Sequence, residues 1–259
     1  MIKKESIKER KNNILSFINK NYKASVNELA LKFDVTEVTI RRDLLSLEED
    51  GKLIRTHGGA ISNRDKAVWQ TTSIKSRMEK FSENKRKIAK ALASKIDNGT
   101  SIFLDGGSTA LFLTNELKEK KSLLVVTNCP SIAETLAGIN DNKVILAGGE
   151  LYSETDLTLG PTCENNLKLY RTDIAVIGVS GILLNEGIFS SIPQECAAKK
   201  IMIQNASKVY VIADSSKIER TAFSFIEDFT NIDILFTDDE ITKDQIAKLK
   251  DKGVSVVVV

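Results

Sequence analysis

The sequence predicts two parts of different fold class: an N-terminal all-α winged helix-turn-helix, then an α/β domain with an open, mainly parallel sheet. Two observations predict this division. Up to about residue 60, apolar residues recur at helical spacing between capping signals, whereas from about residue 99 short Val, Ile and Leu runs alternate with helical stretches. A chain of 259 residues with 42% hydrophobic content can form two packed cores. We expect domains at 1–60 and 75–259, joined by a linker at 61–74.

The N-terminal part begins with a predicted helix at about 6–20, and a capping signal marks a second helix. Ser25 and Glu28 have the S-x-x-E spacing of a capping box, in which each side chain accepts a hydrogen bond from the other residue's backbone N–H. The residues that follow form an apolar stripe at helical spacing: Val26, Leu29, Ala30 and Phe33. A turn at 34–35 then leads to a third helix.

The third helix has the features of a recognition helix, which reads bases in the major groove of DNA. Thr36 is a suitable N-cap, and apolar residues at 40, 44 and 47 mark the inward face. The outer face of the first turns of this helix is therefore expected to be exposed to solvent. From such a face, arginine can form a bidentate pair with guanine. The candidate DNA-binding residues here are Thr36, Glu37, Val38, Thr39, Arg41 and Arg42. The alternative interpretation is a solvated helix with two incidental arginines.

A β-wing is predicted after this helix. Gly51 ends the helix, residues 52–55 suit a short strand, and 57–59 (His-Gly-Gly) suit a turn. Arg55 and His57 would then lie near the phosphate backbone of bound DNA. His57 is the only histidine, which leaves no histidine cluster for a metal site, and an incidental surface histidine is the alternative for this residue.

The run VTEVTIRRDLLSLEEDGKLIRTHGGA at 35–60 resembles the signature of the DeoR family of bacterial repressors of sugar metabolism. That signature joins a TIRRDL recognition helix to an R-x-HGGA wing. One departure is Thr36, where the family most often has Ser, and either hydroxyl can cap the helix. The resemblance implies that double-stranded operator DNA is a partner.

Composition indicates a soluble, cytoplasmic protein that does not bind membranes. The sequence has no run of about 18 apolar residues, and its basic N-terminus lacks the apolar region of a signal peptide. The three cysteines (Cys129, Cys163 and Cys196) lack C-x-x-C spacing, which favours reduced, buried residues over disulfides or zinc ligands. Residues 1–66 hold 14 Lys and Arg against 10 Asp and Glu, a mild basic excess that fits phosphate contacts.

The α/β part opens with a predicted helix at 82–97, and short apolar runs then alternate with helices. Several runs are continuous Val, Ile and Leu, as expected of parallel strands that are buried on both faces. The predicted strands are 100–104, 122–127, 143–147, 173–178, 208–213, 233–237 and 254–259. The predicted crossover helices are 109–120, 130–138, 194–205 and 243–251. We therefore expect an open sheet of six or seven strands.

Polar turns follow several of these strands at their C-terminal ends: 105–109, 127–128, 148–150, 180–181 and 214–217. Open α/β sheets bind ligands in the crevice beyond these ends. The first turn, Asp-Gly-Gly-Ser-Thr, opens a helix, and such a turn offers backbone N–H groups and a positive dipole end to an anion. Lys217 can add a cation. This chemistry suits a small phosphorylated polyol, although the first turn alone could be a tight turn with an N-cap.

The stretches LDGGSTA, VVTN, LAGGEL, E-x-x-x-K and ADSSK resemble the sensor domain of DeoR-type regulators, which is similar in fold to ribose-5-phosphate isomerase. With the N-terminal match, the resemblance covers essentially the whole chain. It implies a sugar-phosphate effector that relieves repression, no cofactor, and a homo-oligomer, either dimer or tetramer. The effector-binding residues implied are Asp105, Gly106, Gly107, Ser108, Thr109, Asn128, Gly149, Glu195 and Lys217. Ser180 stands where the family more often has Asp.

A sugar-phosphate isomerase fused to a DNA-binding domain is a second function class, because isomerases share the expected fold. Isomerisation needs a carboxylate base and a group that stabilises the enediolate. Glu195 with Lys199 is the only obvious pair, and its simpler interpretation is an i,i+4 salt bridge. The Asp-Gly-Ala-Asp turn of such isomerases is absent, so we expect a regulator that is not an enzyme. A third class, in which the second domain only oligomerises, would leave the polar turns unexplained.

Overall fold

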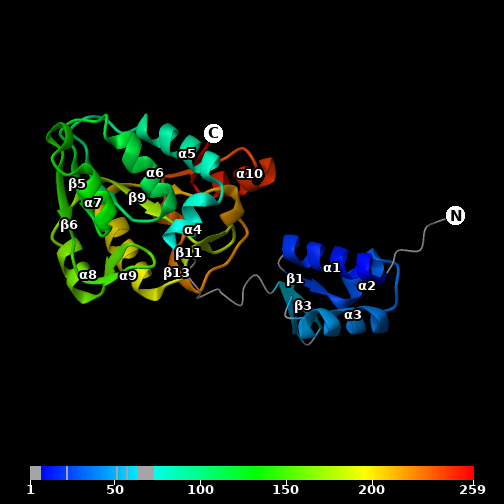
Figure 1. The fold of residues 1–259 in the computed structure, drawn as a ribbon. Helices are drawn as coiled ribbons and strands as arrows, with labels where there is room; N and C mark the ends of the chain where they lie inside the picture. The colour runs from blue at the N-terminus through cyan, green and yellow to red at the C-terminus, as the bar shows by residue number, and fades with distance from the viewer. Residues whose placement is uncertain (1–6, 22, 51, 57, 63–72) are drawn as a thin grey trace. The chain divides into compact units, whose positions relative to one another are not determined.

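The computed structural model describes residues 7–21, 23–50, 52–56, 58–62 and 73–259. The chain divides into two compact units, Met1–Ala67 and Val68–Val259, each with its own hydrophobic core (Figure 1). The boundary at Ala67 falls inside the segment that the sequence assigns to a linker. Gly51 and His57 of the predicted wing lie outside the described residues.

The first unit combines helices with a small antiparallel sheet. Its helices are α1 (Ile7–Asn21), α2 (Val26–Lys32) and α3 (Glu37–Glu49). Its described strands are β1 (Lys23–Ser25), β2 (Leu53–Thr56) and β3 (Gly59–Ser62), in the order β1-β3-β2. The predicted capping box is confirmed, because the Glu28 N–H donates to Ser25 Oγ at 3.1 Å and the Ser25 N–H to Glu28 Oε2 at 3.4 Å.

The sheet of the first unit has a strand that the sequence did not predict. Strand β1 is only three residues long, and too short for a pattern of alternation. It pairs with β3 so closely that a Cβ on Gly59 would lie 2.1 Å from the carbonyl oxygen of Ala24. Only glycine fits there, so this wing glycine is explained by backbone packing. The core beneath is apolar: Ile14, Ile18, Leu29, Ile40, Leu44 and Leu47.

The second unit is built on a parallel sheet, as predicted. Within 73–259, all of which the structure describes, seven strands lie in the order β15-β14-β12-β9-β4-β5-β6, and every neighbouring pair is parallel. The strands are β4 (Ser101–Leu104), β5 (Leu124–Thr127), β6 (Lys143–Leu146), β9 (Thr172–Gly178), β12 (Ala206–Ile212), β14 (Ile234–Thr237) and β15 (Ser255–Val258). All seven coincide with predicted strands, and the fold class is confirmed.

Helices cover both faces of this sheet. They are α5 (Ser82–Ala93), α6 (Ser108–Leu117), α7 (Pro130–Leu136), α8 (Pro161–Leu167), α9 (Pro193–Gln204) and α10 (Lys243–Asp251). Helices α5 and α6 pack together on one side of the sheet, and α8 and α9 on the other (Figure 1). The four predicted crossover helices correspond to α6, α7, α9 and α10.

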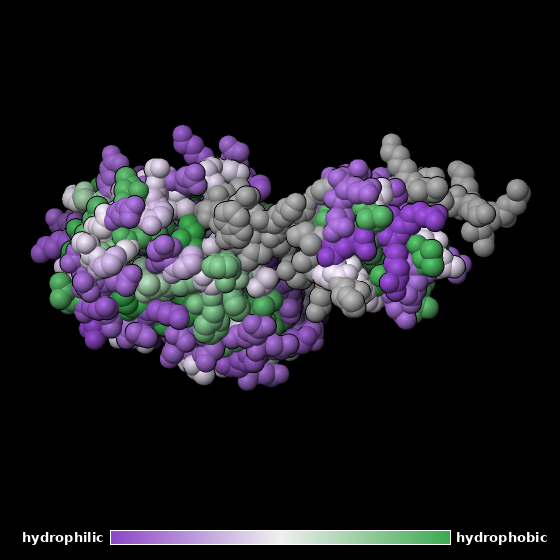
Figure 2. Space-filling view, turned by 90° about the horizontal axis from the view of Figure 1, so that it is seen from below, coloured by the Kyte–Doolittle hydropathy of each residue, from purple (hydrophilic) through white to green (hydrophobic). Residues whose placement is uncertain are grey.

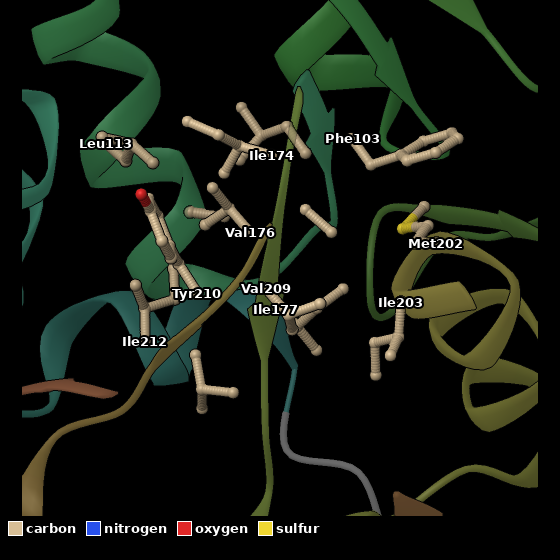
Figure 3. Close-up of a cluster of buried hydrophobic side chains, with 14 of the residues drawn as sticks. Phe103, Leu113, Ile174, Val176, Ile177, Met202, Ile203, Val209, Tyr210 and Ile212 are labelled. Atoms are coloured by element: carbon tan, nitrogen blue, oxygen red, sulfur yellow. The ribbon is translucent and has the colours of Figure 1, made fainter. Parts of the chain in front are cut away.

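The central strand β9 contributes buried side chains to the core on both faces of the sheet. Ile174 and Val176 lie on the side of Leu113 of α6, whereas Ile177 points the other way, toward Met202 of α9 (Figure 3). All five side chains are buried. Because successive residues of a strand face opposite sides, a strand covered on both faces must be apolar throughout, which explains the continuous apolar run.

Several short elements of the second unit were not predicted. They are α4 (Ile74–Glu79), α8, the hairpin β7 (Glu150–Tyr152) with β8 (Leu157–Leu159), and a small sheet of β10 (Gly181–Leu183), β11 (Gly187–Ser190) and β13 (Ser224–Glu227). Single 3-10 turns occur at Ile139–Asp141, Ser215–Lys217 and Phe229–Asn231. The turn at Ser215–Lys217 follows β12 and positions Lys217 at the C-terminal edge of the main sheet.

The molecular surface mixes hydrophilic and apolar residues, as Figure 2 shows for one face. No helix in the described part of the chain is both long and apolar enough to cross a membrane. The three cysteines are free and buried, in agreement with the sequence analysis. Burial raises the pKa of the Cys163 thiol to about 12, so this side chain stays protonated.

Candidate functional site

The N-terminal half of α3 presents a polar face beside its buried face. Thr36 is the N-cap, and its Oγ accepts a hydrogen bond from the Thr39 N–H at 3.3 Å. On the far side, Arg10 of α1 and Asp43 form an ion pair at 2.7 Å that ties α3 to α1. Among the predicted DNA-binding residues of this helix, Thr36, Glu37, Val38, Arg41 and Arg42 are exposed and Thr39 is half-buried.

The two arginines of α3 differ in their partners. Arg41 pairs with Glu37 at 3.0 Å, and both side chains are about half exposed, so the pair is weak and easily exchanged. Arg42 forms no ion pair with any residue that the structure describes. Its guanidinium therefore keeps its donors available for a base edge or a phosphate.

The wing is held to α3 by one glutamate. Glu48 Oε1 accepts the Arg55 backbone N–H at 3.0 Å, and Glu48 Oε2 lies 3.7 Å from Arg55 Nη1. Strand β2 is thereby fixed beside α3, with the Arg55 side chain exposed. The arrangement presents a helix with two exposed arginines, of which Arg42 has no ion pair among the described residues, next to a wing, which is the geometry of a DNA reader.

A second polar site lies at the C-terminal edge of the large sheet. Asp105 follows β4, Asn128 follows β5, Gly178 ends β9 and Asp214 follows β12. These four strands are consecutive in the order β12-β9-β4-β5. Because neighbouring strands are about 4.8 Å apart, these residues lie along one edge of the sheet, which we call the crevice because open α/β sheets bind ligands at this edge.

Asp105 forms a buried ion pair at the centre of this edge. Its Oδ2 contacts Lys199 Nζ of α9 and accepts the Gly178 N–H at 3.0 Å. The alternative interpretation of Glu195 and Lys199 as a salt-bridged pair was wrong, because Lys199 reaches Asp105 while Glu195 accepts a hydrogen bond from Ser190 Oγ. Burial lowers the pKa of Lys199, but the carboxylates of Asp105 and Glu195 outweigh it and hold the pKa above its usual value.

Several buried polar atoms at this edge have no hydrogen-bond partner. They are Asp105 Oδ1 and both amide atoms of Asn128, in residues that are each 1% exposed. A buried polar atom without a partner costs about 1–3 kcal/mol. Orphaned groups on adjacent strands are therefore expected where a ligand supplies the missing hydrogen bonds.

The turn after β4 leads into the N-terminus of α6. Gly107 is the N-cap with φ of 127°, a conformation that favours glycine, and no side chain caps the helix. A Cβ on Gly106 would meet the Leu157 side chain at 2.2 Å. The hydroxyls of Ser108 and Thr109 are nearly buried and form no hydrogen bond to another described residue. The first N–H groups of α6 therefore face the crevice without a competing cap.

A cluster of cations, which we call the cation cluster, surrounds the end of β12. It consists of Arg77, Lys85, Lys217 and Arg220, with Asp214 as the acidic member. Burial lowers the pKa of Lys217 to about 8, with Asp214 opposing and the other three cations lowering it further. The Nε and Nη2 atoms of Arg77 are buried and have no hydrogen-bond partner. Among the charges that act on Lys217, the cations outnumber the carboxylate, and such an excess of positive charge favours an anion.

Three members of the cation cluster were missed by the sequence analysis: Arg77, Lys85 and Arg220. They precede or follow the recognised turns, and the sequence showed each of them only as a basic residue near a predicted boundary.

Gly149 was predicted as an effector residue, and the structure gives it a packing role. Its φ is 116°, and a Cβ there would lie 2.4 Å from the carbonyl oxygen of Leu159. Ser180 Oγ accepts the Ser191 N–H at 3.3 Å.

A helix-turn-helix unit followed by an α/β unit with a polar crevice is the architecture of a ligand-responsive transcriptional regulator. Residues 10–66 match the DeoR-like helix-turn-helix domain, and residues 80–239 match the DeoR C terminal sensor domain. The chain belongs to the DeoR family of transcriptional regulators.

Relatives align over nearly the whole chain. The HTH-type transcriptional regulator GlpR of Haloferax volcanii is 31% identical over 96% of this chain and 96% of its own length. The glycerol-3-phosphate regulon repressor of Escherichia coli K12 is 32% identical over 89% and 90%. The HTH-type transcriptional repressor GlcR of Bacillus subtilis is 33% identical over 87% and 86%. These relatives are named regulators and repressors, which confirms the expectation of a regulator that is not an enzyme.

Among solved structures, ribose 5-phosphate isomerase A of Methanocaldococcus jannaschii is similar with a TM-score of 0.39 and 21% identity. The match covers 53% of this chain and 54% of that chain.

Proposed function

We propose that this protein represses an operon of sugar metabolism by binding operator DNA as a homo-oligomer, and that a phosphorylated sugar in the crevice releases it. We place it in the cytoplasm, where its DNA is. The observation that carries the ligand assignment is the cation cluster beside orphaned polar groups. One end of the crevice holds Arg77, Lys85, Lys217 and Arg220, and the other holds the free atoms of Asp105 and Asn128.

A phosphate dianion fits the basic end. It supplies acceptors for the unpartnered guanidinium of Arg77 and neutralises part of the excess positive charge. The uncapped N-terminus of α6 lies beside Asp105, at the other end, where its N–H groups can donate to oxygens of the sugar. Sugar hydroxyls, which donate and accept, fit Asp105 Oδ1 and the Asn128 amide. Of the predicted effector residues, we retain Asp105, Gly107, Ser108, Thr109, Asn128 and Lys217 as direct contacts.

The DNA assignment rests on α3 and the wing. We propose base contacts from Arg42 and Arg41, the latter after exchange of its pair with Glu37, and a phosphate contact from Arg55. One recognition helix reads only a few base pairs, so a symmetric oligomer that presents two helices supplies the affinity that a single copy lacks. Light scattering of the purified protein measures the oligomer directly.

The experiment is a thermal-shift screen with glycerol 3-phosphate, fructose 1-phosphate, glucose 6-phosphate and ribose 5-phosphate. Each compound is paired with its unphosphorylated parent and with inorganic phosphate. A ligand at 100 times its Kd should stabilise the folded unit by roughly 2.7 kcal/mol. The best compound is then titrated into a complex with double-stranded DNA that the protein has selected from a random pool.

Two variants control this experiment. Lys217→Met removes a cation of the cluster and should abolish the shift, whereas Lys208→Met removes an exposed lysine at the other end of β12 and should leave it unchanged. Equal shifts with a sugar phosphate and its unphosphorylated parent, or full binding by Lys217→Met, would contradict the proposal.

A further inference from the structure

The short helix α4 (Ile74–Glu79) is the first described element after the segment that leads from the first unit into the second. None of its six residues, all of them described, is buried. It lies against α6 with several half-buried residues, and polar contacts fix its two ends. At its start, the Ile74 N–H donates to the carbonyl oxygen of Glu154 at 2.8 Å. A helix without a buried apolar face has little packing energy to hold it, so its position is sensitive to those polar contacts.

The end of α4 is held by the ammonium of Lys85, which belongs to α5. Lys85 Nζ donates to the carbonyl oxygens of Arg77, at 2.6 Å, and of Lys80. The side chain is buried, with the residue 4% exposed, and it satisfies carbonyls that the helix end leaves open. Lys85 is also a member of the cation cluster beside Asp214. One buried ammonium therefore joins the end of α4 to the ligand crevice.

The side chain of Arg77 makes the second link between α4 and the crevice. Its Nε and Nη2 are buried and have no hydrogen-bond partner. The charge of Arg77 acts on both Lys85 and Lys217 and lowers the pKa of each. An arginine with unsatisfied donors, held among other cations, gains a charge-assisted pair only when an anion enters.

We propose that α4 transmits the effect of ligand binding in the crevice to the segment that leads to the DNA-binding unit. Arg77 is the contact between α4 and the anion. A ligand shifts a conformational equilibrium only through interactions that differ between its two states. The Nε and Nη2 atoms of Arg77 are unpartnered without the anion and would be paired with it, and that difference acts on a helix whose ends are fixed through Ile74 and Lys85. The inference rests on the proposed function and specifies how the same site regulates DNA binding.

The first test is hydrogen exchange of the α4 amides in the full-length wild-type protein. The panel compound with the largest thermal shift, and separately inorganic phosphate, are compared with sodium chloride at the same ionic strength. Exchange across 74–80 should slow by about tenfold when the anion binds. Exchange that stays unchanged while the panel compound releases DNA would overturn the inference.

The second test separates binding from response. Arg77→Gln should bind the panel compound more weakly, yet at saturation it should neither slow α4 exchange nor change DNA affinity. The matched control is Lys75→Gln, an exposed residue of the same helix, which should behave as wild type. An Arg77→Gln variant that released DNA fully at saturating ligand would refute the role of α4.

The third test uses the tether. Without ligand, Lys85→Met should speed hydrogen exchange of the α4 amides about tenfold, and its DNA affinity should no longer respond to ligand. Lys87→Met, which removes an exposed lysine of α5, should change neither property. If the wild type bound no sugar phosphate at all, the proposed function would fail. The exchange test in inorganic phosphate would then decide the inference by itself, because slower α4 exchange supports it and unchanged exchange overturns it.

Discussion

Effector affinity should fall as the pH rises from 7 to 9, and the ionisation of Lys217 sets the size of the effect. Burial among other cations lowers the pKa of this ammonium to about 8, from an ordinary value of 10.5. A bound phosphate dianion favours the charged form and should return the pKa to at least its ordinary value. The phosphate itself does not titrate here, because its second pKa is about 6.

The sign and magnitude follow from proton linkage. Without ligand, the Lys217 ammonium loses its proton above pH 8. At higher pH, Lys217 must therefore take up a proton when the ligand binds, and the affinity for the ligand declines. Lys217 is about 90% protonated at pH 7 and about 10% at pH 9 for a pKa of about 8. Affinity should therefore drop about tenfold, or about 1.4 kcal/mol, over this range.

The assay is isothermal titration calorimetry with the best panel compound at pH 7, 8 and 9 and constant ionic strength. Lys217→Arg is the matched control, because a guanidinium stays charged throughout and its titration curve should be nearly flat. Wild-type affinity at pH 9 within about twofold of that at pH 7 would refute the reasoning. The same tenfold drop in Lys217→Arg would assign the titrating group to another residue.

Arg42→Ala should cost about 1–3 kcal/mol of operator affinity and relax preference at one base pair, whereas Arg55→Ala should weaken all sequences equally and flatten the salt dependence, both measured by gel shift. Asn128→Leu should raise the Tm of unliganded protein, because it removes two orphaned polar atoms, while weakening effector binding. Leu113→Ala should lower the free energy of unfolding by about 2–5 kcal/mol in urea melts. Wild-type protein should show no isomerase turnover, and steady turnover that disappears in Glu195→Gln would contradict the regulator assignment.

The parallel sheet could be predicted from the sequence because each strand can be recognised from its own residues alone. A strand covered on both faces is a continuous apolar run, and 173–178, which became most of β9, is such a run without reference to any other part of the chain. The recognition helix was predictable for the same reason, since Thr36 and the apolar spacing after it lie within a dozen residues.

The composition of the crevice could be predicted only in part, because its ion pairs join distant segments. Asp105 was identified from its turn, but its partner Lys199 lies 94 residues away and its local pattern suggested Glu195 instead. Arg77 was assigned to no site, although the fold brings it near enough for its charge to lower the pKa of Lys217. Spacing along a helix reports neighbours on that helix, and it carries no information about a charge that arrives from another element.

The charges of the crevice also determine which way a ligand lies in it. Around β4, one buried cation, Lys199, faces the two carboxyl groups of Asp105 and Glu195, whereas around β12 four cations face Asp214. A phosphate placed beside Asp105 would meet two carboxyl groups and one cation, whereas one placed beside Lys217 would meet four cations and the Asp214 carboxylate, a net positive charge. The two ends lie about two strand spacings apart, close to 10 Å, which an extended sugar phosphate of five or six carbons approaches and a three-carbon one does not. The charge difference that orients the ligand therefore favours the longer sugar phosphates of the panel. If glycerol 3-phosphate bound more tightly than the pentose and hexose phosphates, the ligand would have to lie entirely at one end of the crevice, which would contradict this orientation.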